Sequence, residues 1–195
     1  MAYIDRELVF QENKIYFTDT TGEKAVMMDW EAPIMYASAQ YVAENGGNIL
    51  EIGYGMGISA GYIQSFRPNS HTIVEIHPEI ARVANAWGRK QQGVTVLQGD
   101  WYKIKSQIEE RGPYDGIFYD AYGDENEQRL VEFCISLLNK GGRFTLWNPL
   151  PYPFGNEQRI RDGEVTYDVI DLSEVYKPEN DYFNHNVYYL PKIQL

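Results

Sequence analysis

The sequence contains few of the residues that build disulfides and metal sites. Cys134 is its only cysteine, so no disulfide can form within the chain, and we expect a reducing, cytoplasmic location. The three histidines, His71, His77 and His185, are scattered without the spacing of metal ligands. We therefore predict neither a structural zinc nor another metal site.

Positive charge and long apolar runs are also scarce. The formal net charge of -11 argues against a nucleic-acid partner bound through a basic face, and no apolar run reaches the length of a membrane span. The first ten residues carry Asp5, Arg6 and Glu7, unlike a signal peptide. With 195 residues, 44% of them hydrophobic, the chain is long enough for one domain with a sizeable core.

The stretch Asn48–Ile58 is the most informative part of the chain. Its apolar start, Ile49, Leu50 and Ile52, is typical of a buried strand, and three glycines, Gly53, Gly55 and Gly57, follow at every second position. Glycines let the backbone turn sharply and let a ligand approach closely. A strand, a glycine turn and a helix beginning at Ile58 would present N–H groups to a polar ligand.

An acidic residue on the next predicted strand indicates what kind of ligand the glycine turn could bind. The segment 71–76 predicts a second buried strand with Glu75 near its end, about twenty residues beyond the glycine turn, where an acid can accept hydrogen bonds from ribose hydroxyls. Each feature alone also suits a plain turn, but together they favour a nucleoside site. They do not distinguish NAD from S-adenosylmethionine.

Strands and helices then alternate, which predicts a parallel sheet with helices on both faces. Further strands are expected over residues 94–97, 114–120 and 143–148, and ligands gather where such strands end. That edge carries the glycine turn together with Glu75, Asp100, Trp101, Asp120, Ala121, Tyr122 and Asn148. We also expect Cys134 on a buried helix face, as an inert apolar side chain.

The two ends of the chain have a different pattern. Residues 1–28 predict an extended or hairpin segment over the site, and residues 29–148 the cofactor-binding core. A proline-rich loop and two strands without a clear helix between them fill residues 149–195. The whole is therefore predicted to be one α/β domain whose parallel sheet ends in an antiparallel C-terminal strand pair.

Three helices are predicted from capping residues and apolar spacing. The first begins at Trp30 with Asp29 as its cap. The second begins at Pro78 and directs Ile80, Val83, Ala84 and Trp87 toward the core. The third runs through Leu138 and is closed by Gly141 and Gly142.

With these segments placed, the sequence resembles the guanidinoacetate methyltransferase group, including arginine methyltransferases that modify the internal guanidine nitrogen. The match at Glu51–Gly57 is shared by many methyltransferases, with Tyr54 where Phe is common. The block Met27–Met35, with its Trp-Glu-Ala-Pro core, is more distinctive. The segment 114–122 resembles the family's catalytic strand, with Ala121 where Thr is usual. The resemblance implies a class I methyltransferase, with a Rossmann-like sheet, that uses S-adenosylmethionine and releases S-adenosylhomocysteine.

The resemblance also assigns the site residues. Glu31, Asp120 and Tyr122 would line the acceptor site as catalytic residues, and Glu75 would hold the ribose. The cofactor would be bound by Glu51, Gly53, Gly55, Gly57, Glu75, Ile76, Asp100, Trp101 and Asp120. The acceptor, the molecule that receives the methyl group, would be a small guanidine, arginine-like or guanidinoacetate-like.

The chemistry of a guanidine suits two carboxylates. A guanidinium is charged at physiological pH and presents paired donors that carboxylates match bidentately. Glu31 and Asp120 could localise the charge, orient one nitrogen and accept its proton, although the sequence does not say which takes the proton. Taken singly, Glu31 also suits a helix dipole and Asp120 a turn.

Two other functions remain open at this stage. The segment 119–124, with Asp120 and Asp124, faintly resembles aminopropyltransferases of the spermidine synthase type. A cofactor-binding protein without catalysis, acting through a tyrosine-rich surface, is the second alternative. The chain is short for an aminopropyltransferase, and the Trp30-Glu31-Ala32-Pro33 block has no place in that group.

One difference between this sequence and the family that it resembles concerns the choice of acceptor. The resemblance implies that the substrate carboxylate rests on backbone N–H groups just after the fifth strand, and here that stretch is Asn148-Pro149-Leu150-Pro151-Tyr152-Pro153. Proline has no N–H, so only Leu150 keeps its amide in this turn. We therefore expect guanidinoacetate not to be the preferred acceptor.

Overall fold

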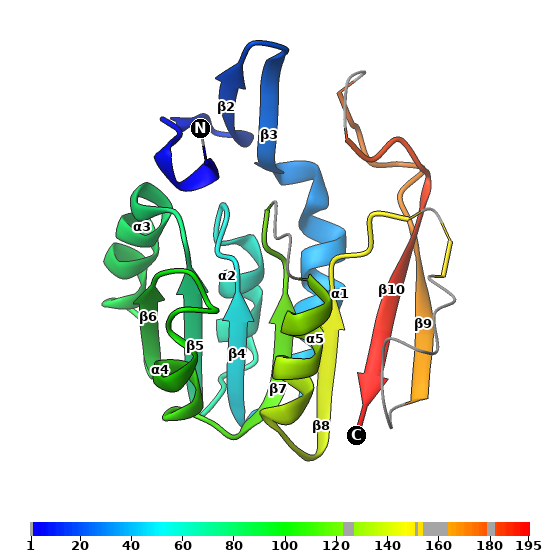
Figure 1. Ribbon diagram of the computed structural model, residues 1–195. Helices are drawn as coiled ribbons and strands as arrows, with labels where there is room; N and C mark the ends of the chain where they lie inside the picture. Colours follow the sequence, from blue (N-terminus) through cyan, green and yellow to red (C-terminus); the bar gives the residue numbers. More distant parts are fainter. Residues whose placement is uncertain (1, 123–126, 151, 154–163, 179–181) are drawn as a thin grey trace.

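The computed structural model describes residues 2–122, 127–150, 152–153, 164–178 and 182–195. It contains a seven-stranded sheet in the order β6-β5-β4-β7-β8-β10-β9 (Figure 1). The strands β4 (Asn48–Ile52), β5 (Ser70–Glu75), β6 (Val94–Gln98), β7 (Tyr114–Tyr119) and β8 (Leu138–Leu146) are parallel. The last two strands, β9 (Glu164–Asp171) and β10 (Val187–Gln194), form an antiparallel pair beside β8. The predicted sheet and its C-terminal pair are confirmed.

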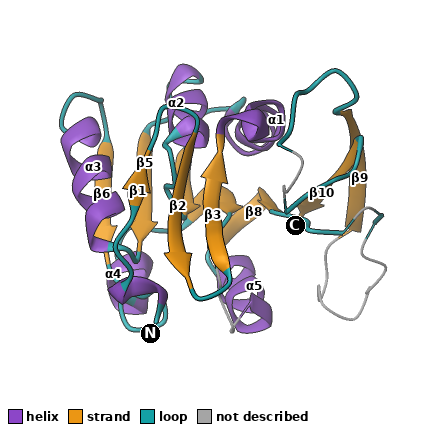
Figure 2. Cartoon of the chain, turned by 90° about the horizontal axis from the view of Figure 1, so that it is seen from above, coloured by secondary structure: helices purple, strands orange, loops and turns teal. Residues whose placement is uncertain are grey.

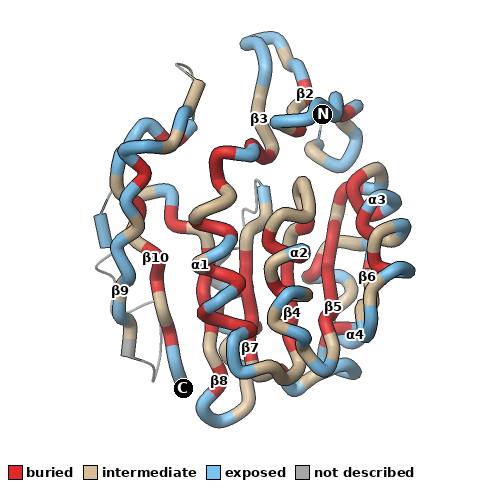
Figure 3. Tube along the Cα trace, turned by 180° about the vertical axis from the view of Figure 1, so that it is seen from behind, coloured by how far each residue is buried: buried red, intermediate tan, exposed pale blue. Residues whose placement is uncertain are grey.

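Five α-helices in the described ranges cover the two faces of this sheet. One face carries α1 (Ala32–Ala43), α2 (Ile58–Ser65) and α3 (Pro78–Gly88), which lie in front of the strands in Figure 3. The opposite face carries α4 (Lys105–Glu109) and α5 (Glu127–Ser136). Apolar strand residues are buried on both faces, as in a doubly covered parallel sheet. Among the described residues, no helix is long and apolar enough to span a membrane.

A second, smaller sheet stands over the carboxyl ends of the strands. It consists of β1 (Val9–Phe10), β2 (Lys14–Asp19) and β3 (Gly22–Met28), preceded by a short 3-10 helix, Tyr3–Asp5. We call β1, β2 and β3 the N-terminal sheet. Figure 2, which views the molecule from above, shows it lying across the tips of the large sheet. Its β3 continues through a 3-10 turn, Asp29–Glu31, into α1.

Three local predictions are wrong. Asp29 does not cap a helix starting at Trp30, because the chain first makes the 3-10 turn and the α-helix begins at Ala32. Val83 is exposed, since Ile80, Ala84 and Trp87 already form the inward stripe of α3 and Val83 points beside it. The third helix ends at Ser136.

The glycine pair after that third helix lies inside a strand. Leu138 begins β8 and pairs with Tyr114, and the register shifts before Arg143 pairs with Gly116. Gly141 has a φ of 82° at this irregular point. A left-handed glycine suits a strand irregularity as well as a helix end, so the glycine pair alone could not separate the two structures.

Candidate active site

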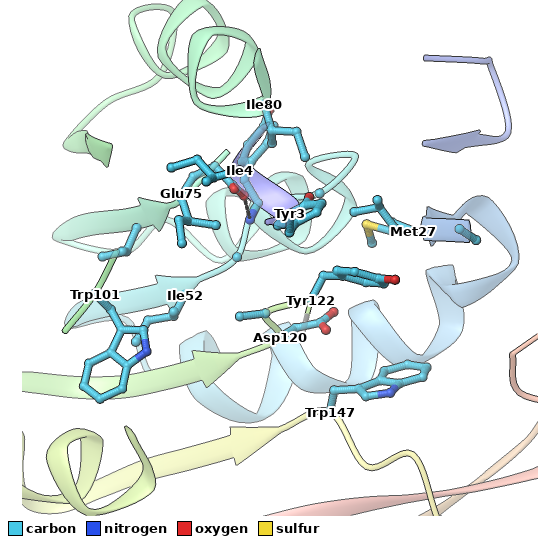
Figure 4. A pocket seen from close by; sticks show the side chains of 18 of the residues that line it. Tyr3, Ile4, Met27, Ile52, Glu75, Ile80, Trp101, Asp120, Tyr122 and Trp147 are labelled. Carbon is cyan, nitrogen blue, oxygen red and sulfur yellow. Dashed lines mark hydrogen bonds between the residues drawn. The ribbon is translucent and has the colours of Figure 1, made fainter. Parts of the chain in front are cut away.

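A cavity of about 760 Å³ lies between the N-terminal sheet and the carboxyl ends of the large sheet. Its wall is built from the ends of β4, β5, β7 and β8, from β3, and from the segment before β10. Figure 4 shows Glu75, Trp101, Asp120, Tyr122 and Trp147 around this space. The predicted edge of the sheet and the predicted N-terminal segment thus meet at one cavity.

The glycine turn fits closely against the neighbouring strand. At Gly53 the φ is 94°, and a Cβ there would lie 1.8 Å from the backbone oxygen of Asp120. Gly57 has a φ of 75° and a Cβ would meet the ring of Tyr54. Gly53 and Gly55 line the cavity, whereas Gly57 does not. Only glycine allows the turn this course, which brings its backbone to the cavity.

Glu75 lies at the end of β5, buried at the cavity wall. Its carboxylate accepts hydrogen bonds from the N–H of Tyr54 at 2.9 Å and of His77 at 2.7 Å. Burial raises the pKa of Glu75, and these backbone donors counteract the increase. Ile76, the next residue, also lines the cavity. Glu75 therefore connects the glycine turn to β5 through a hydrogen bond, and it also lines the cavity.

The structure does not bring Glu51 to the cavity. Its side chain is fully buried beneath the turn, where it accepts a hydrogen bond from the Ser59 hydroxyl and pairs with Nε2 of His71 at 3.0 Å. Direct cofactor contact by this carboxylate is therefore not supported. The apolar strand pattern of 48–52 gave no indication that one of its residues is an internal acid facing a buried histidine.

Asp100 and Trp101 line the cavity beyond the end of β6. Trp101 is buried and stacks on Phe133, with ring centroids 5.6 Å apart and planes inclined by 23°. The Oδ1 atom of Asp100 accepts the N–H of Tyr102 at 3.0 Å. The two residues thus bring an aromatic side chain and a carboxylate to this end of the cavity.

Asp120 and Glu31 reach the same cavity from different elements. Asp120 follows β7, and burial together with the charges of Glu51 and Glu75 raises its pKa to about 7. Glu31 is buried at the start of α1, where its carboxylate accepts the N–H of Met28 at 2.8 Å and the hydroxyl of Tyr182. The pair of carboxylates that the sequence suggested is thus assembled at one site.

Tyr122 lines the cavity next to the N-terminal segment. Its ring centroid lies 5.0 Å from that of Tyr3 and 5.9 Å from that of Phe17, and 40% of the residue is exposed. Tyr3 lies close to Glu75, and burial and that charge raise the pKa of its phenol. The aromatic contacts attach the N-terminal segment to the tip of β7.

Sequence reasoning missed several residues of the cavity, notably Trp147 and Tyr182. Trp147 follows β8 and could have been found from the rule that strand ends carry the site. Tyr182 lies in an irregular segment, where no periodic pattern marks it. Asn148, which was expected at the edge, is fully buried and does not line the cavity.

The raised pKa of Asp120 predicts a pH-dependent cost to stability. Below about pH 4 the carboxyl is protonated in both the folded and unfolded chain, and above about pH 7 the folded chain must carry a buried charge. Stability from this group is therefore lost as the pH rises toward 7. In thermal melts, the stability of Asp120→Asn relative to the unmodified protein should therefore increase as the pH rises from 5 to 8, by up to a few kcal/mol. A difference that stays constant over this range would contradict the buried-carboxyl assignment.

Comparison with known proteins places these features in a family. The sequence model of the guanidinoacetate N-methyltransferase family matches residues 11–148. Protein arginine N-methyltransferase 2 of Aspergillus oryzae is 35% identical over 175 residues, covering 86% of this chain and 39% of that protein. The protein of the same name from Saccharomyces cerevisiae is 29% identical over 218 residues, covering 99% of this chain and 51% of its own length. The chain thus spans about half, or less, of these relatives.

Solved structures show the same fold at low sequence identity. An O-methyltransferase from Bacillus cereus, in complex with SAH, has a TM-score of 0.63 at 18% identity and covers 87% of this chain and 82% of its own. Precorrin-6y C5,15-methyltransferase from Geobacter metallireducens has a TM-score of 0.61 at 13% identity and covers 92% and 94%. The match over 138 of 195 residues, together with this fold, shows that the chain belongs to the guanidinoacetate N-methyltransferase family of class I S-adenosylmethionine-dependent methyltransferases.

Proposed function

We propose that this chain transfers a methyl group from S-adenosylmethionine to a guanidino nitrogen of an arginine-like acceptor. The observation that carries the proposal is the pair of carboxylates, Glu31 and Asp120, facing the cavity that also holds the glycine turn and Glu75. The names of the curated relatives agree with an arginine acceptor.

The cavity fits the cofactor. Backbone at Gly53 and Gly55 comes to its surface, and Ile52, Val74 and Ile80 give it apolar walls. We assign the ribose hydroxyls to Glu75 and the adenine to the side of Asp100 and Trp101. When bound, S-adenosylmethionine supplies a methyl group on a positively charged sulfur. Asp120, beside Gly53, would stabilise that positive charge.

The two carboxylates have different capacities. Asp120, whose pKa is about 7, can accept a proton from the acceptor near neutral pH, as an effective general base should. Glu31 is held by the N–H of Met28 and by Tyr182, so its position is fixed. We therefore assign the proton to Asp120 and the orientation of the guanidinium to Glu31. Trp147 and Tyr182 would flank the planar group, since guanidinium stacks favourably on aromatic faces.

In the described stretch 148–150, directly after β8, the backbone N–H groups are already used within the protein. The N–H of Asn148 donates to the hydroxyl oxygen of Tyr188 at 2.8 Å, and the N–H of Leu150 donates to Oδ1 of Asn148 at 3.0 Å. Pro149 has no N–H. Both amides in this described stretch are already used within the protein, which supports the expectation for guanidinoacetate; Pro151 lies outside the described residues.

An acceptor panel tests this proposal. We expect arginine, or an arginine residue in a peptide, to exceed guanidinoacetate in kcat/KM by roughly ten- to a hundredfold, the cost of one missing hydrogen bond to a carboxylate. The panel should include agmatine and short guanidines, with product masses read by mass spectrometry.

Three other outcomes of the panel have distinct meanings. Polyamine products would indicate the aminopropyltransferase alternative, whose second acid, Asp124, lies outside the described residues. Binding of S-adenosylmethionine without any product would favour the non-catalytic alternative. Guanidinoacetate as the best acceptor would show that its carboxylate is bound in another way.

A further inference from the structure

The strand β3 forms a continuous wall of the cavity. Its five consecutive residues Glu23–Met27 all line it, and they become progressively more buried from Glu23, which is exposed, to Met27. Figure 1 shows β3 descending from the tip of the N-terminal sheet toward α1. The strand therefore leads from the surface to the base of the cavity.

Within the described part of the chain, one edge of β3 has no strand beside it. In the order β1-β2-β3, the described chain pairs β3 with β2 only. In an antiparallel pair, alternate residues turn their N–H and C=O groups away from the partner strand. Such an edge is a template on which another extended chain can pair. Figure 2 shows β3 as the outer strand of the N-terminal sheet, on the side of α1.

The lower end of β3 contacts both halves of the site. The sulfur of Met27 accepts the N–H of Met56 at 3.1 Å, which joins the strand to the glycine turn. The N–H of Met28 donates to Glu31 at 2.8 Å, which joins it to the acceptor side. A chain paired along β3 would therefore run toward the two carboxylates, with alternate side chains directed to one side of it.

The net charge of the protein and the cavity wall opposite β3 also favour an extended chain that carries an arginine. Trp147 and Tyr182 line the same cavity, with ring centroids 6.3 Å apart, and can contact the long side chain of arginine. The net charge of -11 favours a cationic partner. A small carboxylated guanidine, by contrast, has no amide anchor at Asn148 or Leu150.

We propose that the acceptor is an extended polypeptide segment that pairs, as an added strand, with the edge of β3 that the described residues leave unpaired. It would place one arginine side chain between Glu31 and Asp120. This inference rests on the proposed function. It adds that affinity comes from backbone hydrogen bonds along β3, with the arginine side chain giving specificity.

A scan of modified peptides tests the docking mode without altering the enzyme. A short arginine peptide is compared with versions that are N-methylated at one backbone nitrogen each, on both sides of the arginine. Each N-methyl group removes one N–H donor, which should lower kcat/KM roughly two- to tenfold where that N–H faces β3. Because strand pairing uses every second residue, we expect the loss at alternate positions and near-normal values at the positions between them.

The outcomes separate this inference from the proposed function. If free arginine or agmatine matches the peptide in kcat/KM, or if the N-methyl scan shows no alternation, docking on β3 is wrong while guanidine methylation stands. If neither peptides nor small guanidines accept a methyl group, the proposed function itself fails. The unmodified peptide and its lysine-for-arginine version serve as controls, and the latter should give no product.

Discussion

Asp120→Asn is expected to lower the turnover number about 10²–10⁴-fold, the usual effect of removing a general base. Asparagine keeps the shape of the side chain but can neither accept the proton nor balance the charge of the guanidinium. The carboxylate suits this task because burial and the charges of Glu51 and Glu75 raise its pKa to about 7. Single-turnover kinetics at saturating cofactor and acceptor would measure the loss directly.

The control for this variant is cofactor affinity, which should change far less than turnover. Glu31→Gln provides a matched comparison on the acceptor side, and we also expect its turnover to fall sharply. Glutamine preserves one oxygen that can accept the N–H of Met28, so the start of α1 should keep its structure. Near-normal turnover in either variant would show that the residue concerned has a structural role only.

Glu75→Ala is expected to weaken S-adenosylmethionine binding at least tenfold. A hydrogen bond to a charged group contributes about 1.5–3 kcal/mol, and the ribose would lose its acceptor. The same substitution also removes the acceptor of the Tyr54 and His77 N–H groups, which loosens the glycine turn. Isothermal titration calorimetry gives the affinity, and circular dichroism verifies that the variant is folded.

Two further variants locate the cause of that loss. Glu75→Gln retains an oxygen acceptor, so its affinity should lie between those of Glu75→Ala and the unmodified protein. Glu79→Ala removes a nearby acid that does not line the cavity and instead accepts the N–H of Leu8 at 3.2 Å. It should bind the cofactor nearly normally. Unchanged affinity in a folded Glu75→Ala protein would remove the ribose assignment.

The arrangement of the large sheet could be predicted because its signals are local. Strand patterns at Asn48–Ile52 and Ser70–Glu75, separated by a glycine turn and a helix, leave few topologies open. The convergence of Glu75, Asp100 and Asp120 follows from the rule that parallel strands end at one edge. The placement of Glu31 depended on the resemblance, since a single acid before a helix has no specific pattern.

The features that were missed depend on contacts between distant segments. Tyr182 meets Glu31 across 151 positions of sequence, and nothing in its irregular surroundings indicates that contact. Glu51 was assigned to the cofactor because of its place beside the glycine turn. Its carboxylate instead pairs with the buried ring of His71. The glycine pair at 141–142 was compatible with a helix end and with a strand, and the pairing with β7 decided the outcome.

The most direct test of the account uses S-adenosylmethionine with an isotopically labelled methyl group and an arginine-containing peptide. After incubation, fragmentation in a mass spectrometer locates the label within the product. We expect it on the guanidino group of the arginine with the unmodified protein, and expect it to be nearly absent with Asp120→Asn. Label on any other group, or equal labelling by the Asp120→Asn protein, would contradict the proposed reaction at Glu31 and Asp120.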